Sequence, residues 1–239
     1  MNSYAKITSS LQLGLPKGSM QAGVLELLAE AGIRTRTTQR SYRPSVSLDR
    51  VDAKLLKPQT IVEMLAIGSR DIGFAGADWV EELDANVVEI LDTGLDPVRL
   101  VAAAPAALLD NGALPQRALI VASEYTRITA SWIQQQGLNA RFLRSYGATE
   151  VLPPEDADCI VDNTATGATL TANGLVIVDE LMRSSTRLYA SCEAMRDVGK
   201  RERIEDLALL LGAVLDARQR VLMEVNVATE RLQELLGLL

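Results

Sequence analysis

The stretch IVDNTATGATL, at residues 160–170, has the pattern of an apolar strand, a loop of small hydroxylic residues and a helix start. Backbone N–H groups at such a helix start, with the positive end of the helix dipole, are suited to binding a phosphate. Gly167 allows close approach of the backbone, and the threonines add hydroxyl donors. Asp162 is placed to accept hydrogen bonds from sugar hydroxyls. We call residues 162–170 the phosphate loop. The alternative interpretation of this pattern is an ordinary capped helix that follows a strand.

Outward from this stretch, strand and helix patterns alternate, which predicts an α/β fold with a parallel or mixed sheet. We expect residues 1–105 plus 188–239 to form one domain with C-terminal helices. Residues 106–187 repeat the same βαβ order and form the second domain, which carries the phosphate loop.

Three local predictions follow from the residue patterns. Residues 87–91 and 98–104 are expected to be separate strands. A helix is expected from Ala168 to Met182. Apolar residues at helical spacing between Ile204 and Leu215 predict an amphipathic helix.

Composition excludes several kinds of chemistry. The 239 residues include no histidine, so no Ser-His-Asp or Cys-His relay and no imidazole metal site is possible. The net charge of −7 argues against a nucleic-acid partner. No apolar run has the length of a signal peptide or membrane span, so we expect a cytoplasmic protein without membrane contact. Cys159 and Cys192 are isolated, which predicts reduced thiols.

Five stretches resemble, in order, the motifs of the ATP phosphoribosyltransferase family, the first enzyme of histidine biosynthesis. These are LPKG at 15–18, DIGFAGAD at 71–78, RLVAAAP at 99–105, GATEVLP at 147–153, and the phosphate loop followed by ANGL at 172–175. The resemblance implies two α/β domains with a central cleft, like type II periplasmic binding proteins. It also implies transfer of the phosphoribosyl group of phosphoribosyl pyrophosphate to N1 of ATP, with Mg²⁺ as cofactor.

The resemblance assigns roles to individual residues. It implies catalytic roles for Lys17, Glu150 and Asp162. Lys17 is expected to neutralise phosphates, and Asp162 to hold the ribose. Glu150 is expected to contact ribose or metal and is the first candidate to accept the adenine proton. Asp78 is also suited to capping the helix that follows it. The residues expected to bind phosphoribosyl pyrophosphate are Asp162, Asn163, Thr164, Ala165, Thr166, Gly167, Ala168, Thr169 and Leu170. Those expected to bind ATP are Lys17, Gly18, Arg40, Gly76 and Asp78.

Some positions depart from the family pattern. Ser19 stands where much of the family has Arg, and Ala165 where Glu is frequent. Residues 57–62, KPQTIV, replace a charged segment. These changes remove charge on the ATP side, where Arg40 and Arg43 are candidate substitutes. An inactive paralogue or a ligand-binding regulatory module with the same cleft is therefore the alternative function.

The family resemblance also implies partners. A homodimer or larger homo-oligomer is expected, with a regulatory domain or subunit in addition. The sequence ends in the apolar stretch LLGLL at 235–239, where long members of the family enter their histidine-binding domain. A truncated long form and an interface element are both compatible with this end, and we expect activity without histidine sensitivity.

Overall fold

The computed structural model describes residues 10–36 and 42–221, together with the single residues 226, 228, 233 and 237. Arg40 and the apolar stretch 235–239, apart from Gly237, lie outside this part. The strands are β1 (Leu11–Pro16), β2 (Thr35–Arg36), β3 (Ser45–Val46), β4 (Val51–Leu56), β5 (Ile72–Gly76), β6 (Val87–Pro105), β7 (Leu119–Ser123), β8 (Ala140–Arg144), β9 (Cys159–Thr164) and β10 (Leu175–Ser191). The α-helices are α1 (Met20–Glu30), α2 (Pro58–Ala66), α3 (Ala77–Glu82), α4 (Thr126–Gln135), α5 (Ala168–Ala172), α6 (Cys192–Arg196) and α7 (Val198–Arg218), and the 3₁₀ turns are η1 (Ala106–Leu108) and η2 (Thr149–Val151).

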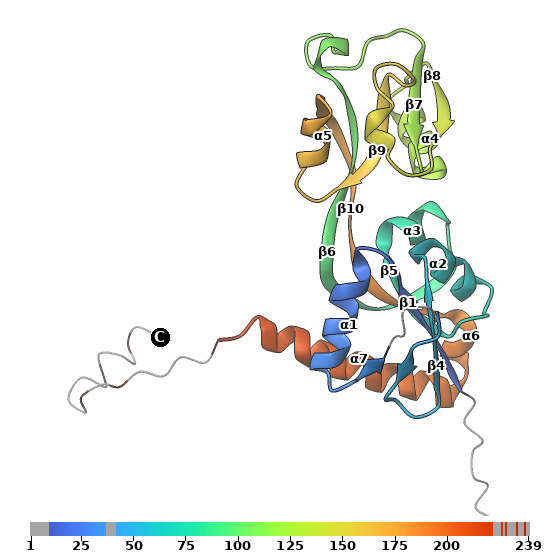
Figure 1. Cartoon of the computed structure of the whole chain (residues 1–239), viewed down its shortest axis with the longest axis vertical. Coiled ribbons are helices and arrows are strands. Elements are labelled where there is room, and N and C mark those ends of the chain that lie inside the picture. Colours follow the sequence, from blue (N-terminus) through green and yellow to red (C-terminus); the bar gives the residue numbers. More distant parts are fainter. Residues whose placement is uncertain are drawn as a thin grey trace, which may run out of the picture.

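One eight-stranded sheet runs through the molecule in the order β4-β1-β5-β10-β6-β9-β7-β8. Figure 1 shows two lobes joined by the long strands β6 and β10. The lower lobe contains β1, β4 and β5 with α1, α2, α3, α6 and α7, and the upper lobe contains β7, β8 and β9 with α4 and α5. Strands β4, β1 and β5 are parallel in the lower lobe, and β9, β7 and β8 are parallel in the upper lobe. The predicted α/β class is confirmed, while the predicted domain boundaries stay a prediction.

The two connecting strands differ from the sequence prediction. Residues 87–91 and 98–104 belong to the single strand β6, because antiparallel pairing with β10 continues from Val87 opposite Ser191 to Pro105 opposite Leu175. The break expected between them is an irregular stretch, in which Gly94 and Asp96 have positive φ angles of 64° and 47°. The prediction of two separate strands is therefore wrong.

The helix predicted from Ala168 to Met182 is also wrong beyond its first turn. Helix α5 ends at Ala172, and Gly174 turns the chain with a φ of 71°. Strand β10 begins at Leu175. The β-branched residues at 176–178 favour this strand, since they pack well on a pleated surface.

Buried apolar residues hold each lobe together. In the lower lobe, Leu13 and Leu15 of β1 pack with Leu27 of α1 and with Ile204 and Leu211 of α7. This contact confirms the amphipathic helix predicted between Ile204 and Leu215. In the upper lobe, one cluster contains Leu100, Val121, Trp132 and Val161. Over residues 10–36 and 42–221, no helix has the length and apolar character needed to cross a bilayer.

Candidate functional site

The predicted site residues lie at the carboxyl ends of parallel strands in both lobes. Lys17 directly follows β1, Asp78 lies just beyond β5, and the phosphate loop begins in the last residues of β9. Ligands of open α/β sheets bind at this edge, because the strand ends and the helix starts meet there. Strand β5 is antiparallel to β10, β10 to β6, and β6 to β9, so the carboxyl ends of the parallel strands in the two lobes face each other along the connecting strands.

Asp162 is presented by the core of the upper lobe. Its neighbours Ile160 and Val161 are fully buried, and Asp162 lies opposite Val101 in the β6–β9 pairing. The Asp162 carboxylate accepts a hydrogen bond of 2.8 Å from the backbone N–H of Asn163. Burial raises the pKa of Asp162 to about 6, and the negative charges of Glu150 and Glu124 act in the same direction. Asp162 is thus largely ionised at neutral pH and becomes protonated at mildly acidic pH.

The phosphate loop is shaped by its own hydroxyl groups. Gly167 has a φ of 83° and precedes α5, and its N–H donates to Thr164 Oγ1 at 2.9 Å. The N–H of Ala168 donates to Thr166 Oγ1 at 3.3 Å. The Thr171 hydroxyl donates to the carbonyl oxygen of Gly167 at 3.1 Å. Because a hydroxyl both donates and accepts, Thr164 and Thr166 keep a hydrogen to offer to a ligand.

A pocket of about 380 Å³ collects most of the predicted phosphoribosyl site. Its lining residues are Val98, Glu150, Asp162, Asn163, Thr164, Ala165, Thr166, Ala168, Thr169 and Leu170. Gly167 is buried inside the turn rather than at the pocket wall. The structure therefore brings Glu150, which lies on a separate turn, and the phosphate loop together in the wall of one pocket.

Glu150 belongs to a loop that is fixed by short polar contacts. The turn η2 carries it, and the buried hydroxyl of Thr149 lies 2.8 Å from that of Ser145. Gly147, with a φ of 107°, donates its N–H to Glu124 Oε1 at 2.6 Å. Glu124 was not among the predicted site residues, although it follows β7 at the same carboxyl edge. Its position directly after a strand is the feature of the sequence that could have indicated it.

Lys17 and Gly18 lie in the lower lobe and are not among the residues that line the pocket of the upper lobe. The Lys17 N–H donates to the carbonyl oxygen of Leu56 at 2.8 Å, and its Nζ lies 4.2 Å from the ring centre of Tyr42. Gly18 has a φ of 84°, which suits glycine at this turn. Ser19 precedes α1, but its side chain makes no capping hydrogen bond within the described residues. Arg43 Nη1 lies 3.7 Å from Asp52 Oδ2.

Asp78 is held by protein partners on both sides. It is 4% exposed, and Oδ1 accepts from Ser184 Oγ at 2.6 Å while Oδ2 accepts from the Tyr125 hydroxyl at 2.6 Å. Helix α3 begins at Ala77 with Gly76 as its N-cap, so Asp78 lies in its first turn, and the prediction that Asp78 caps this helix is wrong. The Tyr125 hydroxyl in turn accepts from Asn163 Nδ2 at 2.9 Å. Asp78 is therefore connected to the phosphate loop through Tyr125, a residue that the sequence motifs did not indicate.

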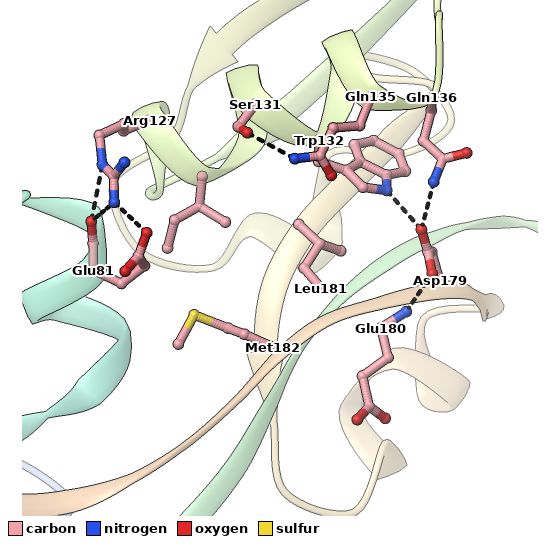
Figure 2. Close-up of a pocket in the computed structure, with 11 residues that line it drawn as sticks. Glu81, Arg127, Ser131, Trp132, Gln135, Gln136, Asp179, Glu180, Leu181 and Met182 are labelled. Atoms are coloured by element: carbon pink, nitrogen blue, oxygen red, sulfur yellow. Dashed lines mark hydrogen bonds and ion pairs between the residues drawn. The ribbon is translucent and has the colours of Figure 1, made fainter.

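A second pocket, of about 400 Å³, lies between α3, α4 and β10 (Figure 2). Trp132 Nε1 and Gln136 Nε2 donate to Asp179 Oδ2 at 2.8 and 3.0 Å. Arg127 of α4 forms an ion pair with Glu81 of α3, and Figure 2 shows this pair at one side of the pocket, with Trp132, Gln136 and Asp179 at the other. Its lining includes none of the predicted site residues. The pocket marks instead a place where the two lobes touch.

Comparison with known proteins places this geometry in one family. The model of the family described as HisG: ATP phosphoribosyltransferase matches residues 57–213, more than half of the chain. An ATP phosphoribosyltransferase of Chlorobium chlorochromatii is 38% identical over 234 residues, which cover 96% of this chain and 80% of that protein. One of Pelotomaculum thermopropionicum is 37% identical over 234 residues, or 96% of this chain and 81% of that protein.

Solved structures agree with the sequence relatives. A chain of the ATP phosphoribosyl transferase (HisG:HisZ) complex from Thermotoga maritima superposes with a TM-score of 0.77 at 25% identity, covering 87% of this chain and 99% of that one. The periplasmic aliphatic sulphonate binding protein SsuA from Escherichia coli superposes at 0.50 with 14% identity, over 88% of this chain and 74% of that one, which is a likeness of fold alone. The expected architecture of type II periplasmic binding proteins is thereby confirmed. The chain belongs to the ATP phosphoribosyltransferase family, whose enzymes transfer the phosphoribosyl group of phosphoribosyl pyrophosphate to ATP in the first step of histidine biosynthesis.

Proposed function

We propose that this chain binds phosphoribosyl pyrophosphate in the pocket that Glu150 and the phosphate loop share. The hydroxyls of Thr166 and Thr169 hold the 5′-phosphate together with loop N–H groups, apart from those of Asn163, Gly167 and Ala168, which donate within the loop. Asp162 accepts hydrogen bonds from the ribose hydroxyls. The observation that carries this proposal is the pocket itself, because it combines hydroxyl donors for a phosphate with two carboxylates for a sugar.

The reaction needs electrostatic positioning rather than a histidine relay. As N1 of adenine forms a bond to C1 of the ribose, the bond from C1 to the pyrophosphate oxygen breaks and positive charge builds on the sugar. The carboxylates of Asp162 and Glu150 stabilise that charge, since preorganised charges act strongly at a developing opposite charge. The alkylated adenine then loses a proton, and Glu150 is the carboxylate that we assign to accept it.

A divalent cation fits the proposed pocket. No group of three or more His, Cys, Asp or Glu side chains is placed to hold a metal alone among the described residues. Mg²⁺ is often bound by one or two carboxylates together with substrate phosphates, and Asp162 and Glu150 supply such a pair beside the phosphate loop. When bound, Mg²⁺ supplies positive charge to the departing diphosphate.

ATP binds on the lower-lobe side in this proposal. Lys17 and Gly18 form the turn after β1, and Gly76 and Asp78 lie where β5 leads into α3. Both pairs therefore lie at carboxyl ends of lower-lobe strands, which face the carboxyl end of β9. Lys17 neutralises the triphosphate, while Arg40 and Arg43 are assigned to the same ligand on sequence grounds. A cytoplasmic location likewise rests on the sequence.

Assembly into a homodimer or larger oligomer, with a regulatory subunit, completes the proposal. Its support is the Thermotoga maritima relative, which was solved as a HisG:HisZ complex. The alternative of an inactive binding module gains no support, because the relatives described above are named as the enzyme.

Calorimetry with each substrate tests the site. We expect the double variant Thr166→Val and Thr169→Val to weaken phosphoribosyl pyrophosphate about 100-fold or more, since hydrogen bonds to charged groups contribute roughly 1.5–3 kcal/mol each. Affinity for ATP should change less than about threefold. Thr35→Val, on β2 of the lower lobe and outside the pocket lining, is the matched control. Equal losses for both substrates would contradict the assignment.

A further inference from the structure

Tyr125 connects the two lobes through a single hydroxyl group. It lies just before α4 in the upper lobe and is 1% exposed. Its hydroxyl donates to Asp78 Oδ2 of α3 at 2.6 Å and accepts from Asn163 Nδ2 of the phosphate loop at 2.9 Å. One phenol oxygen therefore touches the lower lobe and the phosphate loop at once.

The Tyr125 side chain and backbone are both held in place. Its ring stacks on that of Trp79 of α3, with centroids 4.6 Å apart and an interplanar angle of 24°. Its backbone N–H donates to Ser123 Oγ at 2.9 Å, and Ser123 Oγ donates to the carbonyl oxygen of Val161 at 2.6 Å. Val161 precedes Asp162 in β9, so the backbone of Tyr125 is tied to the strand that presents the proposed ribose ligand.

Asp78 is equally fixed on its other side. Ser184 Oγ of β10 donates to Asp78 Oδ1 and accepts from the Asp78 N–H at 3.1 Å. A chain of hydrogen bonds thus runs from β10 through α3 and Tyr125 to Asn163. Buried networks of this kind restrict their members to one arrangement, because each unmade bond carries a desolvation penalty.

Helix α3 also contacts the start of α4 directly. The Glu82 carboxylate accepts from the N–H groups of Arg127 and Ile128, each at 3.0 Å, and so caps α4 from the other lobe. The Glu81–Arg127 pair lies beside it (Figure 2). The beginning of α4, where Tyr125 lies, therefore follows α3 rather than moving independently of it.

The protonation state of Tyr125 does not vary over the working range. Burial and the charge of Asp78 raise the pKa of the Tyr125 phenol well above its usual value. The carboxylates that act on it are Asp78, through a direct hydrogen bond, and Asp162, through space. The hydroxyl therefore acts as a constant donor to Asp78 and a constant acceptor for Asn163.

We propose that Tyr125 is a positioning residue: its hydroxyl holds the Asn163 amide, and with it the phosphate loop, in register with α3 of the lobe that binds ATP. This role rests on the proposed function of the pocket. Tyr125 acts through Asn163 and Asp78, and its ring and backbone contacts serve the fold. Removal of the hydroxyl alone should leave a folded enzyme whose two substrates are misaligned.

The test is Tyr125→Phe, which keeps the ring and its stack on Trp79 but removes both hydroxyl contacts. We expect kcat/KM for phosphoribosyl pyrophosphate to fall about 10- to 100-fold, since small misplacements of reacting groups have effects of this size. KM for ATP should change less than about threefold. The loss should be the same across the pH range in which the enzyme works. Tyr189→Phe, at a buried tyrosine of the lower lobe, is the matched control and should leave both constants unchanged.

A double-mutant cycle separates positioning from simple destabilisation. Asn163→Ala should remove most of the effect of Tyr125→Phe, because the hydroxyl acts through that amide. Additive losses, an unchanged kcat/KM in Tyr125→Phe, or a rise in KM for ATP as large as that for phosphoribosyl pyrophosphate would overturn the proposal. If Tyr125→Phe fails to fold, Ser184→Ala tests the hydrogen bond that fixes Asp78. This variant should lower kcat/KM for phosphoribosyl pyrophosphate by a smaller factor, and an unchanged value would overturn the proposal. Failure of the proposed function is distinct: the wild type would then show no turnover, or the paired Thr166 and Thr169 variant would bind phosphoribosyl pyrophosphate normally.

Discussion

Asp162 and Glu150 line one pocket, where burial and then the negative charge of Glu150 raise the pKa of Asp162 to about 6. Two carboxylates at one site resist ionising together, because each charge disfavours the other. Binding of a cationic transition state or a divalent cation would relieve that repulsion. The unfavourable pairing in the free pocket is thus suited to a ligand that brings positive charge.

The pH dependence of the reaction should report this pair. In the free enzyme, kcat/KM for phosphoribosyl pyrophosphate should fall as the pH drops below about 6, because protonated Asp162 accepts ribose hydrogen bonds poorly. Glu150→Gln removes a charge that raises this pKa, so the acid limb should move to lower pH by a few tenths to about one unit.

The comparison between variants is needed because substrate phosphates also titrate near pH 6. That titration is identical for every enzyme variant, so a shift caused by Glu150→Gln belongs to the protein. Glu155→Gln, at an exposed position of the following loop, is the control and should leave the profile in place. An unchanged profile in Glu150→Gln would contradict the coupling of the two carboxylates.

Stability should change in the opposite direction to activity at Asp162. The folded-state pKa lies above the usual value of 3.8, so the fold favours the protonated form. The associated stability is present below the unfolded-state pKa and is lost as the pH rises through about 6. Asp162→Asn, which retains an acceptor oxygen for the Asn163 N–H, should therefore raise the free energy of unfolding by roughly 1–3 kcal/mol above about pH 7 and by little near about pH 4.

Denaturant unfolding of the wild type and Asp162→Asn at both pH values checks this expectation. The same variant should lose about 100-fold or more in kcat, since a charged ligand contact is removed. A variant that is destabilised at neutral pH would show that Asp162 serves the fold instead of the ligand.

Lys17 offers a test of the ATP side. Lys17→Met keeps much of the side-chain volume but removes the charge, so KM for ATP should rise about 10- to 100-fold, as expected for a lost phosphate contact. Binding of phosphoribosyl pyrophosphate, measured by calorimetry, should stay within about threefold. The control is Lys54→Met, on β4 of the same lobe. Unchanged ATP kinetics in Lys17→Met would make Lys17 a solvated loop residue.

The phosphate loop is the part of the site that the sequence predicts best, because its strand, turn and hydroxyl residues are contiguous. Glu150 was also predicted, and the structure brings it to the pocket wall with Asp162. The continuity of β6 was missed, since Gly94 and Asp96 resemble the end of a strand unless the pairing partner is known. The first part of β10 was predicted as helix.

The hydrogen-bond network of Tyr125 could not be read from local pattern. Its members lie on α3, β9 and β10 and at the residue before α4, and Asp78 and Ser184 are 106 positions apart. A tyrosine just before a helix is ordinary in sequence. Only its place at the carboxyl edge of the sheet, between α3 and the phosphate loop, gives it a candidate role.

The most direct test of the account is the two-substrate assay on the full chain. With Mg²⁺, ATP and phosphoribosyl pyrophosphate, the wild type should release pyrophosphate and change the absorbance of the adenine chromophore, only when both substrates are present. Asp162→Asn should lose this turnover while remaining folded. Absence of turnover in the folded wild type, or full turnover in folded Asp162→Asn, would contradict the assignment of this pocket as the site of phosphoribosyl transfer.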